Sequence, residues 1–287
     1  MYRQYDEETL KRVQNTEKEI LVKFIEICEK YNLKYFAAFG TLLGAIRHRG
    51  FIPWDDDIDV GMLRKDYEKF LKVAQKECGK EFFIQTVDTD PKYHLFFGKM
   101  RMCNTQFVEN SLQQADSVTG FYIDIFPFDA VPDEKKKMTR QLKKAERLSI
   151  LLSVNKVKEP QIGNYSKAKT SVMWGIWYIL HYGMKIFHIT GEKIWRSCEK
   201  TFLKYDQEET QQVTCFFPDA EKWLIKISEL DQLEEILFED IKIKVPVGYD
   251  AILTRNYGDY MKLPPKEKRI NHMPVTIQFP GEEKLDL

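Results

Sequence analysis

The sequence predicts a mixed α/β fold (α+β), with a mixed sheet flanked by helices in the front half and a mainly helical back half. In the front half, short apolar runs bounded by glycine or polar residues alternate with segments of helical periodicity, as in sheets covered by helices. After Pro132 the chain becomes strongly basic, and its longer segments indicate helices. We therefore expect a core at residues 1–132 and a helical region at 133–287, with an approximate boundary; one continuous domain is the alternative.

Three helices and five strands are expected in the front half. The first helix covers about residues 7–31, where Leu21, Phe24 and Cys28 recur at helical spacing. The segment 34–39 is short, aromatic and followed by glycine, as in a buried strand. The other expected helices are 41–48 and 65–78, and the other expected strands are 58–62, 82–86, 95–101 and 121–126.

The back half is expected to hold helices up to about residue 205, then a strand at 241–245 and a helix at 249–257. One segment, 172–189, is apolar and about long enough to span a bilayer. Because His181, Lys185 and His188 interrupt it, a spanning helix is not favoured.

Composition excludes several classes of protein. The 44 Lys and Arg residues balance 44 Asp and Glu residues, so global charge does not favour nucleic-acid binding. The five cysteines are scattered and form no CxxC pair, which argues against a disulfide framework or a zinc site and fits a reducing compartment. The polar N-terminal stretch lacks the apolar core of a secretory signal. We therefore expect a cytoplasmic protein.

The acidic run WDDDIDV is the most informative stretch of the sequence. If residues 58–62 form a strand, alternate side chains point to the same face, so Asp57 and Asp59 lie together. Two close carboxylates repel each other unless a cation separates them, and hard oxygen ligands suit Mg²⁺ or Mn²⁺. The competing interpretation is a solvated acidic turn.

Two neighbouring features favour the metal site over the acidic turn. Gly40 and Thr41 follow a strand and begin a helix, where backbone N–H groups are placed to hold a phosphate. Asp124 lies within the apolar strand FYIDIF, where an unpaired carboxylate would be costly and a metal would provide a partner. A hydrogen-bonded core aspartate is the alternative for Asp124.

These motifs resemble the nucleotidyltransferase-like fold. Gly40-Thr41 corresponds to its Gly-Gly or Gly-Ser element after the first strand, with Thr41 replacing the second residue, Asp57-Ile58-Asp59 corresponds to its acidic pair, and Asp124 to its third acid. The long stretch FGTLLGAIRHRGFIPWDDDIDVGM is similar to the signature of the LicD family of phosphocholine transferases, which the fukutin-related proteins also resemble. The segments FYIDIFPFD and NYGDYMKLPPKEKRINHMP resemble further motifs of that family, whereas about 135–240 carries no assigned motif.

The resemblance implies transfer of a phosphorylated alcohol, typically phosphocholine from CDP-choline, to a sugar hydroxyl. It implies that Asp57, Asp59 and Asp124 form the catalytic and metal site, with Asp124 accepting the proton of the attacking hydroxyl. Gly40 and Thr41 would hold the donor phosphate. The acceptor would be a cell-surface glycan, such as lipopolysaccharide or teichoic acid, or its lipid-linked precursor.

The expected substrate-binding residues surround this centre. Arg47 is the strongest candidate for a phosphate clamp, and His48 lies beside it. Trp54 could stack on the base or on a quaternary ammonium, or it could anchor the loop as a core residue. Either Asp55 or Asp56 could orient the site, and we include Asp55 among the binding residues. The remaining candidates are Lys99 and Arg101 on one strand face, and Arg269 and His272 through the family pattern alone.

Three hypotheses of function remain open at this stage. The alternatives to the family reaction are transfer of a nucleoside monophosphate from an NTP and a non-catalytic binding module. The basic stretch beginning with Lys135, Lys136 and Lys137, followed by the apolar segment 172–189, raises peripheral membrane contact as an added expectation. A solvated basic helix beside a buried helix is its slightly favoured competitor.

Overall fold

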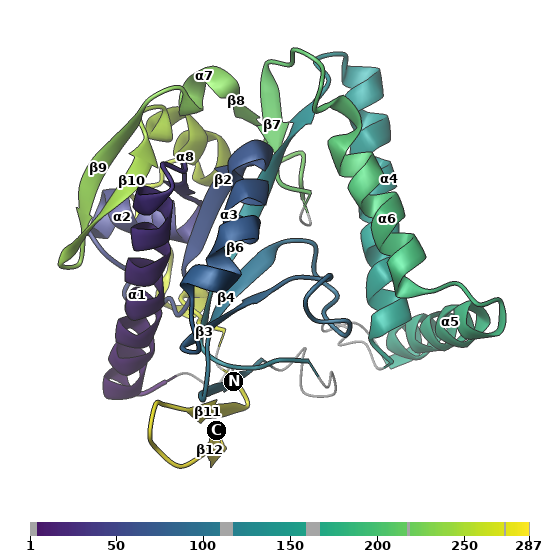
Figure 1. Cartoon of the computed structure of the whole chain (residues 1–287), viewed down its shortest axis with the longest axis horizontal. Coiled ribbons are helices and arrows are strands. Elements are labelled where there is room, and N and C mark those ends of the chain that lie inside the picture. The colour runs from purple at the N-terminus through teal and green to yellow at the C-terminus, as the bar shows by residue number, and fades with distance from the viewer. Residues whose placement is uncertain (1–4, 110–116, 159–166, 217–218, 273, 287) are drawn as a thin grey trace.

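The chain is centred on a seven-stranded mixed sheet, whose central strand is β6 (Figure 1). The computed structural model describes residues 5–109, 117–158, 167–216, 219–272 and 274–286. The main path of the sheet is β1 (Phe36–Ala37), β2 (Asp59–Leu63), β6 (Tyr122–Val131), β4 (Gly98–Met102) and β3 (Phe82–Gln85). The last part of β6 also pairs with β7 (Gln212–Thr214), which pairs in turn with β8 (Ile225–Lys226).

The register of the central strands brings three charged residues together. β2 and β6 are parallel, and Asp59 lies opposite Asp124. On the other side of β6, the antiparallel strand β4 places Lys99 opposite the same aspartate. Because residues paired across neighbouring strands point to one face of a sheet, these three side chains lie in a row.

Two amphipathic helices cover the sheet. α1 (Glu7–Lys30) and α3 (Arg64–Glu77) both contact β6 and also contact each other. Phe24 of α1 packs against Phe70 of α3, with ring centroids 5.0 Å apart. α2 (Phe39–His48) follows β1 and packs against β2. These contacts build the larger of two hydrophobic cores.

Three helices form a second unit beside the sheet. α4 (Lys135–Lys156) packs along α6 (Gly191–Phe202), and α5 (Lys167–Ile186) crosses one end of the pair and extends away from the sheet (Figure 1). A second core of buried residues, including Leu142, Cys198 and Phe202, joins α4 and α6. No described helix is long and apolar enough to cross a membrane.

The later part of the chain forms two small sheets apart from the main one. β9 (Leu233–Phe238) and β10 (Ile241–Pro246) form a hairpin, and β11 (Thr276–Gln278) pairs with β5 (Gln106–Val108) and β12 (Leu285–Asp286). The remaining helices are α7 (Ile227–Leu230), α8 (Tyr249–Tyr257), and the short 3₁₀ helices η2 (Leu203–Tyr205) and η3 (Lys266–Lys268).

The structure confirms the predicted mixed α/β fold. Helices were expected at 7–31, 65–78 and 249–257, and they form with bounds within one or two residues. The back half is less purely helical than expected, since β7, β8, β9, β11 and β12 were not foreseen. Most of these strands are two or three residues long, too short for an alternating pattern. The sheet takes strands from both sides of residue 132, and the division there stays a prediction.

Candidate metal-dependent active site

The start of α2 holds the acidic run in place. The Ala38 N–H donates to the carbonyl of Asp59 (3.0 Å), and the Asp59 N–H donates to the Thr41 hydroxyl (2.8 Å). Phe39, the first residue of the helix, has a φ of 44°, in the left-handed region that a bulky residue rarely occupies. Gly40 matters for close approach, because a Cβ there would lie 2.9 Å from Asp55 Oδ2. Hydrogen bonds and close packing therefore fix the acidic run against the start of α2.

Four carboxylates gather at this point. Asp59 and Asp124 are paired across β2 and β6, and Asp55 and Asp57 precede β2, which begins only at Asp59. Burial raises the pKa of Asp59 well above its usual range, and the charges of Asp57, Asp124 and Asp55 add to this rise. Burial also raises the pKa of Asp55, with Asp57 as the largest charged contributor. Together, these four carboxylates therefore favour a nearby positive charge.

Lys99 is the buried counter-ion of Asp124. Its Nζ lies 2.7 Å from Asp124 Oδ1 and 3.8 Å from Glu109 Oε2, and it sits 3.4 Å from the ring centre of Tyr122. Burial raises the pKa of Asp124 to about 6, although Lys99 opposes the rise. A carboxyl with this pKa can exchange a proton near neutral pH.

His272 closes the cluster from the C-terminal segment. Its backbone N–H donates to Asp56 Oδ1 (2.7 Å), and its ring nitrogen Nδ1 lies 3.3 Å from Asp56 Oδ1 and 3.6 Å from Asp57 Oδ2. Its bond to Asp56 raises the pKa of His272 to about 9, and the charges of Asp57, Asp56 and Asp55 contribute. Without a metal the protonated imidazole thus partly neutralises the acids, and it would have to release this proton to coordinate a cation.

The donor set fits a divalent cation. One ligand atom each from Asp55, Asp57 and His272 lies within 4.8 Å of the other two. Carboxylate oxygens suit Mg²⁺ or Mn²⁺, and an imidazole favours the transition metal of the two. Of the predicted ligands Asp57, Asp59 and Asp124, only Asp57 belongs to this compact group. The predicted set stays a prediction, and Asp59 and Asp124 lie beside the group on the sheet.

Arginine and aromatic side chains form a wall beside the acids. Arg47 donates from Nη1 to the Tyr260 carbonyl (2.8 Å) and from Nε to His48 Nε2 (2.9 Å). The Arg269 guanidinium lies 4.8 Å from the ring centre of Trp54. The sequence motifs at 47–54 and at 257–272 are far apart in the chain, and these contacts bring them together.

Arg101 lies apart from this wall. It is fully buried, donating from Nε to Gln85 Oε1 (2.5 Å) and from Nη1 to the Gly120 carbonyl (2.7 Å). Its guanidinium also faces Tyr122, 4.7 Å from the ring centre. These contacts tie neighbouring segments together, and phosphate binding by Arg101 stays a prediction.

Sequence reasoning missed two residues near the acids. Glu17 on α1 is fully buried, and neither of its carboxylate oxygens has a hydrogen-bond partner in the described structure. Burial and the charges of Asp56, Asp57 and Asp55 raise its pKa. The sequence pattern that could have pointed to Glu17 is its spacing on the buried face of the helix, four residues after Val13 and three before Ile20. The second residue is Tyr257. Burial, and then the charges of Asp59, Asp55 and Asp57, raise its pKa, and in the sequence only the family motif pointed to it.

Comparison with known proteins identifies the architecture. A family model described as "LicD/FKTN/FKRP, nucleotidyltransferase domain" matches residues 32–153. The lipopolysaccharide cholinephosphotransferase LicD of Haemophilus influenzae is 32% identical over 257 residues, which cover 88% of this chain and 91% of that protein. The chain belongs to the LicD family. This finding confirms the family resemblance, and the matched domain contains the motifs at residues 39–62 and 121–129.

More distant similarity reaches two other proteins. The ribitol 5-phosphate transferase FKRP of Homo sapiens is 34% identical over 55 residues, covering 19% of this chain and 11% of that protein. The uncharacterized protein RT0683 of Rickettsia typhi is 29% identical over 147 residues, covering 45% of this chain and 46% of its own length. Since its named relatives move phosphate-bearing groups, this member of the LicD family is a phosphotransferase.

Proposed function

We propose that this phosphotransferase moves phosphocholine from CDP-choline to a sugar hydroxyl of a cell-surface glycan or its lipid-linked precursor, with Mg²⁺ or Mn²⁺ bound at the acidic cluster. The observation that carries the proposal is the pairing of Asp59 with Asp124 beside Asp55 and Asp57. Such a concentration of desolvated carboxylates needs a cation, and metal-assisted phosphoryl transfer uses one. The similarity to LicD over most of both chains supports this choice of reaction.

The proposed reaction balances without another reagent. The acceptor hydroxyl oxygen bonds to the phosphorus that carries choline, the bond from that phosphorus to the CMP oxygen breaks, and the hydroxyl proton passes to Asp124. A bound divalent cation would neutralise charge on the phosphates during this step. Asp124 is suited to the proton because its pKa is about 6 and Lys99 holds it in place.

The arginine and aromatic side chains beside the acids are the candidates for binding the donor. Arg47 and Arg269 are the candidates for contact with the diphosphate, since guanidinium groups bind phosphate oxygens in pairs. Trp54 and Tyr257 are the candidates for the choline ammonium or the base, since aromatic faces attract cations. The Thr41 hydroxyl already accepts the Asp59 N–H, so phosphate binding there would use backbone N–H groups at the start of α2.

A lipid-linked acceptor lies at a membrane surface, so peripheral contact with that surface belongs to this proposal. The cytoplasmic side of the membrane is the location that we propose, in keeping with five scattered cysteines that form no CxxC pair.

The test is to incubate the purified protein separately with CDP-choline, CDP-ribitol, CDP-glycerol and CTP, with and without Mg²⁺ or Mn²⁺. Release of CMP and of pyrophosphate is followed beside an Asp57→Asn/Asp59→Asn variant. Metal-dependent CMP release from CDP-choline that the variant lacks is the expected result. Lys69→Gln on the exposed side of α3 is the matched control and should behave as the wild type.

Other outcomes would replace the proposal. CMP release from CDP-ribitol or CDP-glycerol instead would keep the reaction and change the donor. Pyrophosphate release from CTP would favour transfer of a nucleoside monophosphate. Silence with all four donors, persisting after a glycan acceptor is added, would favour a binding module.

A further inference from the structure

Among the described residues, α5 packs on the rest of the molecule through one face. Trp177 donates from its indole N–H to the Val157 carbonyl (2.9 Å), and His181 Nδ1 lies 2.7 Å from the Val154 carbonyl. Met184, one turn further on, is buried in the second core. These residues follow helical spacing, so the inner face of α5 rests on the end of α4.

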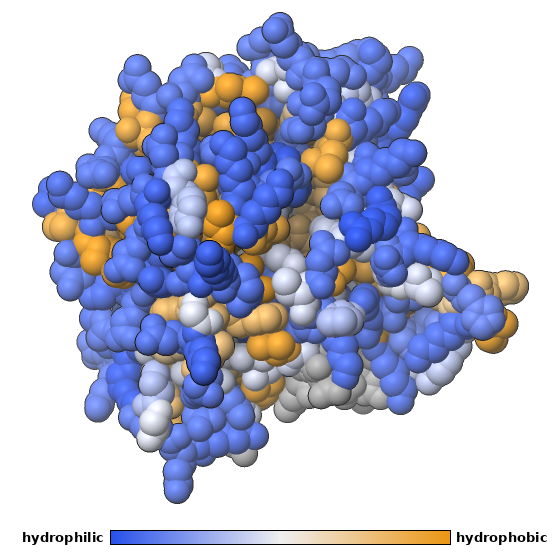
Figure 2. Space-filling model, in the orientation of Figure 1, coloured by the Kyte–Doolittle hydropathy of each residue, from blue (hydrophilic) through white to orange (hydrophobic). Residues whose placement is uncertain are grey.

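The opposite face of α5 is an exposed aliphatic ridge. Val172, Ile176, Ile179 and Ile186 recur at spacings of four, three and seven residues, which places them on one side of the helix. Ile179 is 74% exposed and Ile186 is 71% exposed, and Phe187 just beyond the helix is 78% exposed. Figure 2 shows hydrophobic residues at the outer end of this helix. Such a contiguous apolar surface marks a contact with another molecule or a membrane.

An aromatic row runs beside the ridge. The rings of Trp174 and Tyr178 are 5.6 Å apart, and those of Tyr178 and Tyr182 are 6.2 Å apart and stacked. Lys185 continues the row, with its Nζ 5.6 Å from the Tyr182 ring centre. Tryptophan and tyrosine collect where an apolar phase meets water, because each has an apolar ring and a polar tip.

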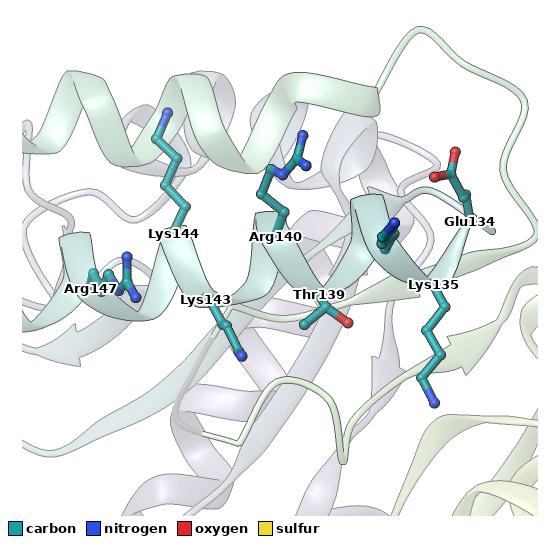
Figure 3. A pocket seen from close by; sticks show the side chains of 8 residues that line it. Glu134, Lys135, Thr139, Arg140, Lys143, Lys144 and Arg147 are labelled. Atoms are coloured by element: carbon teal, nitrogen blue, oxygen red, sulfur yellow. The ribbon is translucent and has the colours of Figure 1, made fainter.

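The charge of α4 and α5 favours binding to an anionic surface. α5 carries lysines near both ends, Lys169 and Lys185, and no acidic residue. Earlier along α4, the basic side chains in Figure 3 line an open groove of about 920 Å³. Together α4 and α5 contain eleven Lys and Arg residues and one acidic residue, although the whole chain has no net charge. Basic charge is therefore concentrated on α5, which carries the ridge, and on α4, against whose end α5 packs.

We propose that α5 is a membrane-surface helix that lies in the headgroup layer of a bilayer containing anionic lipid. The aliphatic ridge enters the acyl boundary, the aromatic row lies at headgroup level, and the lysines contact lipid phosphates. The groove on α4 lies before the end on which α5 packs, so its charges steer the approach and the ridge anchors. A second copy of the chain is the competing occupant, but it would have to bring acidic groups to this basic surface. The biological use of such docking, access to a lipid-linked acceptor, rests on the proposed function.

The test is flotation of the full chain with vesicles of phosphatidylcholine, with and without phosphatidylglycerol. We expect the wild type to float with the anionic vesicles and more weakly with the neutral ones. Ile179→Gln/Ile186→Gln should lower partition into anionic vesicles at least about tenfold, because two exposed isoleucines no longer enter the acyl boundary. Lys169→Glu/Lys185→Glu should weaken the preference for anionic lipid, with the charges of α4 accounting for what remains.

The matched control is Leu237→Gln/Val247→Gln, which removes two aliphatic side chains that are each 51% exposed but lie far along the chain. This control should float as the wild type does. No flotation of the wild type, or flotation that survives the α5 substitutions, would overturn the proposal. So would a dimer in solution that the same substitutions dissociate, because it would assign the ridge to a second copy. Neither donor nor acceptor is present, so failure here is distinct from failure of the proposed reaction.

Discussion

At the scale of single residues, the candidate site depends on charges that are buried together. Asp59, Asp124 and Lys99 lie in register on three strands, and His272 approaches the neighbouring acids from a distant segment. The sequence predicted that Asp59 and Asp124 lie on strands, and the structure pairs them across β2 and β6; their role with Asp57 as metal ligands stays a prediction. It could not predict which basic group faces each acid, because that depends on strand order.

Glu17 is expected to destabilise the metal-free protein at high pH. Its pKa is raised in the folded state, so the folded protein holds a proton that the unfolded chain releases, and stability falls as pH rises above the ordinary glutamate range. Glu17→Gln should therefore raise the melting temperature by a few degrees at pH 8 and by less at pH 5. Thermal unfolding in chelator at both pH values measures this. A melting temperature lowered at pH 8 would mean that the ionised carboxylate has a stabilising partner.

His94 should make the free energy of unfolding fall as the pH is lowered. Burial lowers its pKa to about 4, so between that value and the ordinary histidine pKa the unfolded chain binds a proton that the folded chain does not. This histidine should cost up to about 3 kcal/mol of unfolding free energy as pH falls from 7 to 4. Urea unfolding of the wild type and His94→Gln at both pH values should give a smaller acid loss in the variant. Equal losses would show that His94 is accessible to protons in the folded state.

At the scale of elements, the junction of β1 and α2 shapes the site. The sequence predicted a helix at 41–48, and the structure begins it two residues earlier, at Phe39. Gly40 was expected to bound the preceding strand, but the helix runs through it, a difference in helix bounds that local patterns do not fix. Short strands such as β7 and β11 were missed for a related reason, since their partners β6 and β5 are distant in sequence.

Gly44 on α2 tests this junction. A Cβ at Gly44 would lie 2.5 Å from the Gly50 carbonyl oxygen and 3.1 Å from the Ile52 nitrogen, so α2 would separate from the loop that leads to the acids. Gly44→Ala should cost about 1–3 kcal/mol of unfolding free energy and lower transferase activity. Denaturant unfolding and CMP release measure the two effects.

Gly175→Ala is the matched control for Gly44→Ala. Gly175 also lies within a helix, but nothing would stand within 4 Å of its added Cβ. The control should gain about 0.5–1 kcal/mol, because alanine favours helix more than glycine does. If both variants lost the same stability, close packing of α2 on the loop would not be the cause.

At the scale of the whole molecule, the site joins segments from the beginning, middle and end of the chain. Gln14 of α1 donates to the Asp55 carbonyl (2.9 Å), β6 contributes Asp124, and residues 257–272 add the closing wall. Family resemblance drew attention to the C-terminal motif, but residue pattern alone gave Arg269 and His272 no distinction. The folded chain places Arg269 against Trp54, which precedes the acidic run, and His272 beside Asp56 and Asp57.

A divalent cation should stabilise the whole fold through these acids. A ligand that binds only the folded state adds about 2.7 kcal/mol when its concentration is a hundred times its Kd. Mg²⁺ or Mn²⁺ should therefore raise the melting temperature of the wild type but not that of Asp57→Asn/Asp59→Asn. The variant should also melt above the metal-free wild type at pH 8, because it loses repelling charges. An equal rise in both proteins would place the cation elsewhere.

The continuity of β6 with α4 has one further consequence. Asp124 lies near the beginning of β6, and only a few residues separate the end of that strand from α4, on whose far end α5 packs. A strand and a helix are stiff, so the reacting centre and the proposed anchor keep a set separation. The enzyme would then modify the sugar of a membrane-tethered glycan that lies at this distance from the bilayer. Sugars nearer to the bilayer or farther from it would not be modified.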